Sequence, residues 1–388
     1  MSSSNLIDLF AGAGGLSCGL EMSGFRPVLA NELVETYAET YGLNHPQCPV
    51  IAGDIKKIDE SNIREIVRTE GDIDLIAGGP PCQGFSINAP SRSMDDERNH
   101  LFKEFLRIVS QVGPKAVLIE NVPGIVSMES GEVVSQIYSR LKTMGYAVNH
   151  RILFAGHYGV PQMRFRTVFI GIKNYSGDVF FPDPEYDSSS HANFTGSKDL
   201  CIEIGDRANL KKETTIWDAI GDLPPINCGD KNGTFEYSPC DTTEYRTYSR
   251  KGSDMITSHY CNRLTEINLE RLKFIPPGGS WRDIPIELLP EGLKRARRSD
   301  HTRRYGRLHP EKIGTTIMTK CDPHWGTFFH PYQNRAISVR EAARIQSFPD
   351  RYQFAGNKTQ QYEQIGNAVP PLMARAIGKS IKEMIANG

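Results

Sequence analysis

Short apolar runs, separated by polar and glycine-rich turns, dominate the first 175 residues. Each run is rich in aliphatic residues and ends at glycine, proline, aspartate or asparagine, which is the pattern of buried strands. The predicted strands are residues 5–10, 27–30, 50–52, 74–77 and 116–119, with a closing pair at 146–154 and 167–172. Helical spacing of apolar residues appears at 16–22, 101–112 and 131–144. This alternation predicts an α/β sheet.

The pattern changes near residue 174. From there to about residue 335 the chain is rich in proline, aspartate, serine and glycine, and its periodicity is weak. A helical pattern returns at 338–346, and a final helix is expected from Pro371 to about residue 385. A length of 388 residues favours two domains, or one large domain with an insertion.

Polar residues follow the first three predicted strands, where nucleotides bind in α/β sheets. A glycine-rich turn at 12–15 leads into a helix and offers free N–H groups, although Ser17 occupies the place of the third glycine of a dinucleotide fingerprint. Glu32 could hold ribose hydroxyls, or could favour the N-terminus of the next helix. Asp54, followed by Ile55, could grip an adenine, or could be ordinary turn chemistry after glycine. Spacing alone leaves both alternatives open.

The fourth strand runs into a rigid corner at residues 78–82, Gly-Gly-Pro-Pro-Cys. Two glycines allow close backbone approach and two prolines stiffen the turn. The corner places the Cys82 thiol where ligands bind, although a lone cysteine is more often structural. Glu120 ends the fifth strand and would share that face of the sheet, unless it is a surface carboxylate. The polar loop at 83–99 has the length of a lid or binding loop.

Two sets of arginines are candidates for anion binding. Arg164 and Arg166 are two residues apart, so an extended backbone would project both to one face. Residues 291–307 hold seven Lys and Arg against two acids, beside Tyr305. This run predicts either a polyanion contact or a solvated helix face. The net charge is −1, so any nucleic-acid surface must be local.

The remaining composition excludes several classes of protein. Eight cysteines lie at positions 18, 48, 82, 201, 228, 240, 261 and 321, with no CxxC spacing. This scatter argues against a disulfide framework and a zinc ribbon, and no metal is expected. The polar start predicts no signal peptide, and no apolar stretch has the length of a membrane span. These features predict a protein of the reducing cytoplasm.

Taken together, the motifs resemble those of the DNA (cytosine-5) methyltransferases. Six segments in the family order carry the resemblance: 8–15 (DLFAGAGG), 79–86 (GPPCQGFS), 120–122 (ENV), 162–166 (QMRFR), 340–349 (REAARIQSFP) and 366–370 (GNAVP). The resemblance implies a Rossmann-like fold that binds S-adenosylmethionine, with a smaller inserted target-recognition domain. Residues 1–175 and 335–388 would form the catalytic domain, and 176–334 would bind DNA.

The resemblance also implies the roles of individual residues. Cys82 would add to C6 of a flipped-out cytosine, and Glu120 would hydrogen-bond or protonate N3. Arg164 and Arg166 would hold the cytosine carbonyl and orient Glu120. Residues expected to contact DNA are Ser86, Arg92 and Arg98 of the loop, with Arg295, Arg297 and Arg298 of the basic run.

For the cofactor, the resemblance implies a pocket formed by Phe10, Gly12, Gly14, Glu32, Asp54, Ile55, Pro80, Leu101, Asn367 and Ala368. One departure is Leu33, because many relatives carry an aromatic residue just after the ribose acid. Adenine stacking would then rest on Phe10 and Ile55, with a weaker grip.

The expected substrate is duplex DNA, and the protein is expected to be a monomeric, nucleoid-associated bacterial enzyme. A restriction endonuclease is the expected protein partner. Three rival interpretations differ in their demands on the sequence. An NAD-dependent oxidoreductase would not need the proline–cysteine corner, and an inactive DNA-binding relative would be expected to lack Cys82 or Glu120. A tRNA methyltransferase on the same scaffold would differ in the middle domain, since a tRNA loop and duplex DNA need different surfaces.

Overall fold

The computed structural model describes residues 4–81, 101–188, 197–202, 204–205, 207–230, 232–239 and 241–388. The chain divides into two compact units. The first contains residues 1–158, 164–211 and 368–388, and the second contains 159–163 and 212–367. Residues 335–367 therefore belong to the same compact unit as the middle of the chain. The sequence instead predicts that they belong to the catalytic domain. The functional boundaries, with DNA recognition at 176–334, stay a prediction.

The first unit is built on a seven-stranded sheet with the order β3-β2-β1-β4-β5-β7-β6. Its strands are β1 (Ser4–Leu9), β2 (Phe25–Glu32), β3 (Val50–Ala52), β4 (Leu75–Gly78), β5 (Ala116–Asn121), β6 (Tyr146–Phe154) and β7 (Phe165–Lys173). The first five are parallel, and β7 is antiparallel to both β5 and β6. All the strands predicted from the apolar runs are confirmed, including the neighbouring position of β4 and β5.

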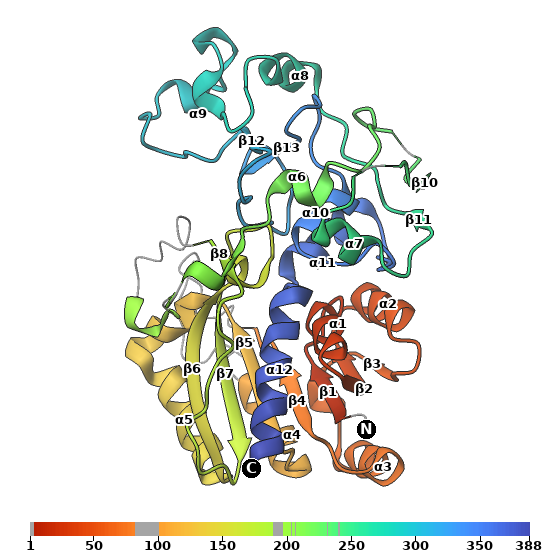
Figure 1. Cartoon of the computed structure of the whole chain (residues 1–388), viewed down its shortest axis with the longest axis vertical. Coiled ribbons are helices and arrows are strands. Elements are labelled where there is room, and N and C mark those ends of the chain that lie inside the picture. The colour runs from red at the N-terminus through yellow and green to blue at the C-terminus, as the bar shows by residue number, and fades with distance from the viewer. Residues whose placement is uncertain are drawn as a thin grey trace. The chain divides into compact units, whose positions relative to one another are not determined.

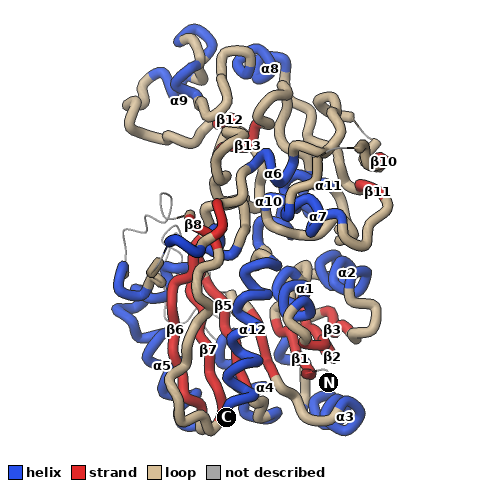
Figure 2. The backbone as a smooth tube through the Cα atoms, in the orientation of Figure 1, coloured by secondary structure: helices blue, strands red, loops and turns tan. Residues whose placement is uncertain are grey.

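Helices cover both faces of this sheet (Figures 1 and 2). They are α1 (Gly15–Met22), α2 (Glu35–Asn44), α3 (Glu60–Glu70), α4 (Leu101–Val112), α5 (Glu132–Thr143) and α12 (Pro371–Asn387). The doubly covered, mainly parallel sheet confirms the predicted Rossmann-like α/β fold. A short pair, β8 (Tyr186–Asp187) and β9 (Lys211–Lys212), follows the sheet.

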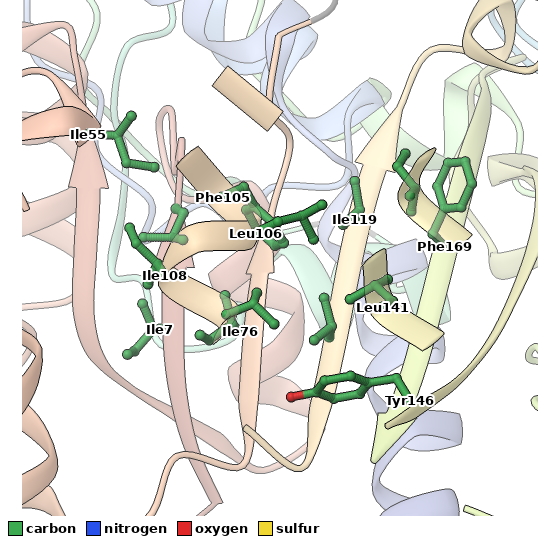
Figure 3. Packing of buried hydrophobic residues seen from close by; sticks show 14 of the residues in the cluster. Ile7, Ile55, Ile76, Phe105, Leu106, Ile108, Ile119, Leu141, Tyr146 and Phe169 are labelled. Carbon is green, nitrogen blue, oxygen red and sulfur yellow. The ribbon is translucent and has the colours of Figure 1, made fainter. Parts of the chain in front are cut away.

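The main core lies between the sheet and helices α3, α4 and α5. Isoleucines of the parallel strands, such as Ile7, Ile76 and Ile119, are at most 2% exposed there, because strands buried on both faces are mostly apolar. Figure 3 shows them packed with Phe105 and Leu106 of α4. Burying such side chains stabilises the fold by roughly 1.5–3 kcal/mol each.

The last helix packs against α1, which directly follows the first strand. A Cβ added to Gly19 of α1 would lie 2.2 Å from the Pro371 carbonyl oxygen and 2.5 Å from the Ala374 Cβ. Only glycine permits this approach of the two backbones. The C-terminal helix is thus joined to the part of the first unit that contains β1 and α1.

The second unit contains short elements joined by long loops. They are α6 (Ile216–Ile220), α7 (Glu244–Arg250), α8 (Glu266–Leu272), α9 (Glu291–Lys294), α10 (Val339–Ile345), α11 (Lys358–Asn367), β10 (Phe235–Glu236), β11 (Met255–Ile256), β12 (Gly306–Arg307) and β13 (Thr327–Phe329). One apolar cluster gathers around the buried Trp281 and Phe329. None of the described helices of either unit is long and apolar enough to span a bilayer.

Buried ion pairs hold α10 in the second unit. Ser338 and Glu341 form a capping box at its N-terminus, and Glu341 accepts two bonds of 2.7 Å from Arg335. Arg344 donates to both carboxylate oxygens of Asp350, at 2.8 and 2.6 Å, and also pairs with Asp222. Because each buried charge has a partner, the helix can be fully enclosed.

Candidate active site

The carboxyl ends of the parallel strands form one edge of the sheet in the first unit. Leu9 at the end of β1 pairs with Asn31 of β2 and with Gly78 of β4, and Gly78 pairs with Ile119 of β5. The polar residues predicted after each strand therefore meet at this edge. Ligands of open α/β sheets bind at such an edge.

A tight turn leads from β1 into α1. Phe10, Gly12 and Gly14 all have positive φ angles, of 56°, 56° and 84°. This conformation is costly for Phe10 and free for glycine. A Cβ built on Gly12 meets no described atom within 4 Å, so the turn borders open space at this point. The turn can therefore accept a ligand close to its backbone.

Glu32 holds this turn in place. Its Oε2 accepts a hydrogen bond of 2.8 Å from the Gly12 N–H, and its Oε1 accepts one of 2.9 Å from the Val34 N–H. Burial raises the pKa of the carboxyl, while these backbone N–H groups oppose the rise. Val34 directly precedes α2, so the bond to Glu32 Oε1 agrees with the alternative that Glu32 favours the N-terminus of the next helix. The other oxygen faces the glycine turn, as ligand binding would require.

Asp54 and Ile55 follow β3. Asp54 Oδ1 accepts a bond of 2.9 Å from the Lys56 N–H, so ordinary turn chemistry accounts for one of its oxygens. Ile55 is 2% exposed and belongs to the core cluster against which Phe10 and Leu101 also pack. Three of the apolar residues predicted for the cofactor pocket therefore lie in one cluster. Leu33, which follows Glu32 in the sequence, is 66% exposed.

Glu120, near the end of β5, lies among positive charges. Its Oε1 is 2.6 Å from Arg166 Nε, and the glutamate and arginine side chains are only 12% and 14% exposed. Burial raises the pKa of Glu120, and the charges of Arg166 and Arg164 oppose this rise without cancelling it. Glycine leaves room beside the other oxygen, since a Cβ on Gly79 would lie 3.1 Å from Oε2. This carboxyl can exchange a proton.

Arg164 is 1% exposed and donates from Nη2 to the Ala368 carbonyl oxygen at 3.1 Å. It precedes β7, and Ala368 lies just before α12, so the bond joins two distant parts of the first unit. Arg164 and Arg166 both influence Glu120 electrostatically. The arginine pair and the acid predicted from separate motifs are thus brought together.

The corner after β4 is fixed by Asn121, which donates from Nδ2 to the Pro80 carbonyl oxygen at 2.8 Å. Pro80 itself is buried. From the sequence, Asn121 is identified only as part of the motif at 120–122. Four predicted residues that follow this corner lie outside the described part of the chain, namely Cys82, Ser86, Arg92 and Arg98.

Other predicted residues belong to the second unit. Asn367 is exposed at the end of α11, whereas its neighbour Ala368 is buried in the first unit. Arg295, Arg297 and Arg298 are exposed. Helix α9 ends at Lys294, so the basic run does not form the single solvated helix face considered as an alternative.

One buried acid of this region was missed as a functional candidate. Asp8, within β1, is fully buried, and its Oδ2 accepts a bond of 2.6 Å from Ser17 Oγ, which is 2.7 Å from Tyr41 OH. Burial raises the pKa of Asp8 to about 7, although the Ser17 bond opposes this. The signal available in the sequence was a single acid within an apolar strand. Asp8 fixes α1 through Ser17 and supports the glycine turn from below.

The described residues contain no group of three or more His, Cys, Asp or Glu side chains arranged to hold a metal ion. The polar groups at the sheet edge are instead carboxylates, arginines and backbone N–H groups. This arrangement suits a nucleotide-like ligand beside a proton-exchanging carboxyl.

Comparison with known proteins extends this picture. Residues 4–383 match the family of C-5 cytosine-specific DNA methylases. Type II methyltransferase M1.HphI of Haemophilus parahaemolyticus is 35% identical over 386 residues, which cover 98% of this chain and 87% of the relative. Type II methyltransferase M.AgeI of Thalassovita gelatinovora is 34% identical over 431 residues, which cover 98% of this chain and 99% of the relative. A crystal structure described as a prophage-encoded DNA modification methyltransferase (E. coli) has a TM-score of 0.74 at 26% identity, covering 99% of this chain and 100% of that chain.

Proposed function

Because the chain belongs to the family of C-5 cytosine-specific DNA methylases, we propose that it transfers a methyl group from S-adenosylmethionine to C5 of a cytosine flipped out of duplex DNA. The observation that carries the proposal is Glu120, whose side chain is 12% exposed and whose pKa is raised, beside Arg166 and Arg164. A carboxyl of this kind can give a proton to a ring nitrogen, which a permanently ionised surface carboxylate cannot.

The proposed nucleophile is Cys82. Cytosine C5 is a poor nucleophile, so the Cys82 thiolate first adds to C6 and makes C5 electron-rich. The electron pair displaced toward N3 is neutralised there by a proton from Glu120. Bound S-adenosylmethionine supplies the methyl group that C5 takes. Loss of the C5 proton to water, departure of the Cys82 thiolate and return of the N3 proton to Glu120 then restore the aromatic ring.

Arg166 and Arg164 are proposed to position the cytosine and its proton donor. Arg166 holds Glu120 Oε1 and leaves Oε2, beside Gly79, for the base. Arg164 is fixed by the Ala368 carbonyl and adds positive charge where the cytosine carbonyl would lie. Flipping the base costs a few kcal/mol of stacking and pairing, which contacts from Ser86, Arg92 and Arg98 are proposed to offset.

The strand ends fit an adenosyl ligand. The open space at Gly12 and the carboxylate of Glu32 suit a ribose, and Asp54 suits an adenine amino group. Phe10, Ile55 and Leu101 supply an apolar wall. Gly14, Pro80, Asn367 and Ala368 are proposed to complete the pocket.

The similarity to Type II methyltransferases supports a finer proposal, that the protein is the modification enzyme of a restriction–modification system. It would act as a cytoplasmic monomer on DNA, with a restriction endonuclease as its natural partner. DNA from cells that express it should then resist a nuclease of the same specificity. Full cleavage of such DNA at fully methylated sites would contradict this role.

The direct test is transfer of labelled methyl groups from S-adenosylmethionine to duplex DNA, followed by identification of the modified base. We expect 5-methylcytosine, whose sequence context bisulfite sequencing would give. Transfer to the exocyclic N4, or to tRNA alone, would overturn the proposal.

Covalent trapping tests the nucleophile separately. A duplex with 5-fluorocytosine at the target site cannot lose its C5 substituent as a proton, so protein and DNA should remain joined through Cys82. The Cys82→Ser variant should bind DNA and form no adduct. Methyl transfer by that variant at the wild-type rate would remove Cys82 from the mechanism.

A further inference from the structure

Four arginines gather on consecutive turns between α9 and β12 in the second unit. They are Arg297, Arg298, Arg303 and Arg304. The chain turns at 297–300 and again at 301–304, and backbone hydrogen bonds of 2.8 and 3.0 Å close the two turns. The turns present several guanidinium groups within a short stretch of the surface.

The buried Trp281 anchors these turns to the core of the unit. Its indole Nε1 donates to the His301 carbonyl oxygen at 3.1 Å, and its backbone N–H donates to the Arg304 carbonyl oxygen at 3.1 Å. Thr327 Oγ1 donates to the Arg303 carbonyl oxygen at 3.3 Å. Trp281 is 3% exposed and belongs to the apolar cluster of the unit. The backbone that carries the second turn is therefore fixed.

Arg304 stacks on an exposed aromatic side chain. Its guanidinium carbon lies 4.8 Å from the ring centroid of Trp325, which is 55% exposed. The indole packs edge-on against His324, with centroids 4.8 Å apart, and the His324 Nδ1 is 2.9 Å from Tyr305 OH. The contact with the indole restrains the Arg304 guanidinium, while the 55% exposed Trp325 and the half-buried Arg304 stay accessible to a ligand.

The arginines of these turns keep a positive charge at the surface. Arg297, Arg298 and Arg303 are exposed, and no ion pair joins them to another residue of the described chain. The acids nearby are Asp300, within the turns, and Asp322, which accepts a bond from the His324 N–H. Elsewhere in this unit arginines are buried against carboxylates, as Arg335 is against Glu341. A cationic surface with an exposed indole fits a nucleic acid.

The geometry points to Arg304 as a residue that determines sequence specificity, reading the edge of a guanine in duplex DNA while Trp325 holds its guanidinium. Arg297, Arg298 and Arg303 contact phosphates. A guanidinium held in one orientation is suited to the bidentate contact with guanine O6 and N7. This assignment rests on the proposed function and names the part of the second unit that reads the substrate.

The test compares methyl transfer on the duplex that wild-type protein modifies with transfer on duplexes that carry each single base-pair replacement. We expect Arg304→Ala to lose discrimination at one guanine position by about tenfold to a hundredfold. Arg304→Lys should not restore it, because an ammonium cannot make the planar bidentate contact. Trp325→Ala should relax the same position, and Trp325→Phe should relax it less.

Phosphate-contacting variants provide the contrast. Arg303→Ala should weaken binding of every duplex alike and reduce the salt slope of log Kobs by about 0.9. Arg351→Ala, an exposed arginine of the same unit outside these turns, should change neither discrimination nor salt slope. Cofactor binding and the midpoint of urea unfolding should remain unchanged in all variants, which reports that both units are folded.

Two outcomes would overturn the assignment of Arg304. One is an equal loss on all duplexes with a reduced salt slope, as for a phosphate contact, and the other is an unchanged discrimination profile. Failure of the proposed function is recognised separately, because the wild-type protein would then transfer no methyl group to any duplex DNA.

Discussion

Each unit contains a buried glutamate beside arginine, and the two carboxyls behave in opposite ways. The pKa of Glu341 is held well below its ordinary value, although burial alone would raise it, because the Arg335 charge and hydrogen bonds outweigh desolvation. The pKa of Glu120 is raised, because the desolvation cost exceeds the effect of Arg166 and Arg164. A neighbouring arginine by itself therefore does not decide the protonation state.

The number of donors on each oxygen explains the difference. Glu341 accepts two hydrogen bonds of 2.7 Å from Arg335 and one of 2.6 Å from the Ser338 N–H. His330 Nε2 lies 3.6 Å from Glu341 Oε1. Glu120 has its 2.6 Å contact with Arg166 at Oε1, and Oε2 faces Gly79. The first carboxylate is saturated and serves the structure. The second keeps an oxygen available and can serve a reaction.

The largest effect is expected for Glu120→Gln. Without a transferable proton, the rate of methyl transfer should fall by about 10² to 10⁴-fold. The midpoint of urea unfolding should move little, because a raised pKa means that the folded protein does not favour the charged form of Glu120, which the neutral Gln replaces. Radiolabelled methyl transfer under saturating DNA measures the rate, with the exposed Glu65→Gln as the matched control. A rate near that of the wild type would exclude proton donation by Glu120.

The converse is expected for Glu341→Gln. Removing one partner of a buried pair leaves Arg335 uncompensated and should lower the free energy of unfolding by about 3–5 kcal/mol. Chemical denaturation of this variant, beside the exposed Glu287→Gln, measures the loss. At a temperature where the variant is still folded, the methyl transfer rate should stay within a few-fold of the wild type. An unchanged stability would contradict the structural role of this pair.

The pH dependence of stability should have opposite signs at the two sites. Since the folded-state pKa of Glu341 is lowered from 4.5, its contribution is complete above pH 4.5 and is lost as the pH falls toward the folded value. Since the pKa of Glu120 is raised from 4.5, stability should decrease as the pH rises through the interval above 4.5. Unfolding free energies of wild type and the two Gln variants across pH 3–8 measure both slopes. Slopes of the same sign would refute the comparison.

A smaller effect is expected for Gly79→Ala. The added Cβ would lie 3.1 Å from Glu120 Oε2 and crowd the oxygen proposed to face the base. Methyl transfer should fall about tenfold, equivalent to about 1.4 kcal/mol on the barrier, while the fold persists. Steady-state kinetics should place the loss in kcat rather than in the KM for S-adenosylmethionine. A variant as active as the wild type would show that this oxygen needs no such space.

The strands of the first unit and its helices α1, α4, α5 and α12 could be predicted closely from the sequence, whereas no ranges were predicted for α2 and α3. Apolar runs of the parallel strands and the glycine and proline turns at their ends are local signals, and the register of β1, β2 and β4 then aligns those ends. The second unit was harder to assign. Its elements are short, and its core residues, such as Trp281 and Phe329, come from irregular segments without periodicity.

The sequence by itself determined the family, the doubly covered sheet and the candidate residues at the strand ends, because these depend on residue type and spacing. Only the tertiary structure decided which oxygen of Glu120 is bound, that Arg164 reaches Ala368, and that Asp8 is buried with Ser17. Protonation and pairing depend on desolvation and on neighbours distant in the chain. Neither the desolvation of a group nor its contacts with distant neighbours is set until the backbone has brought those groups together.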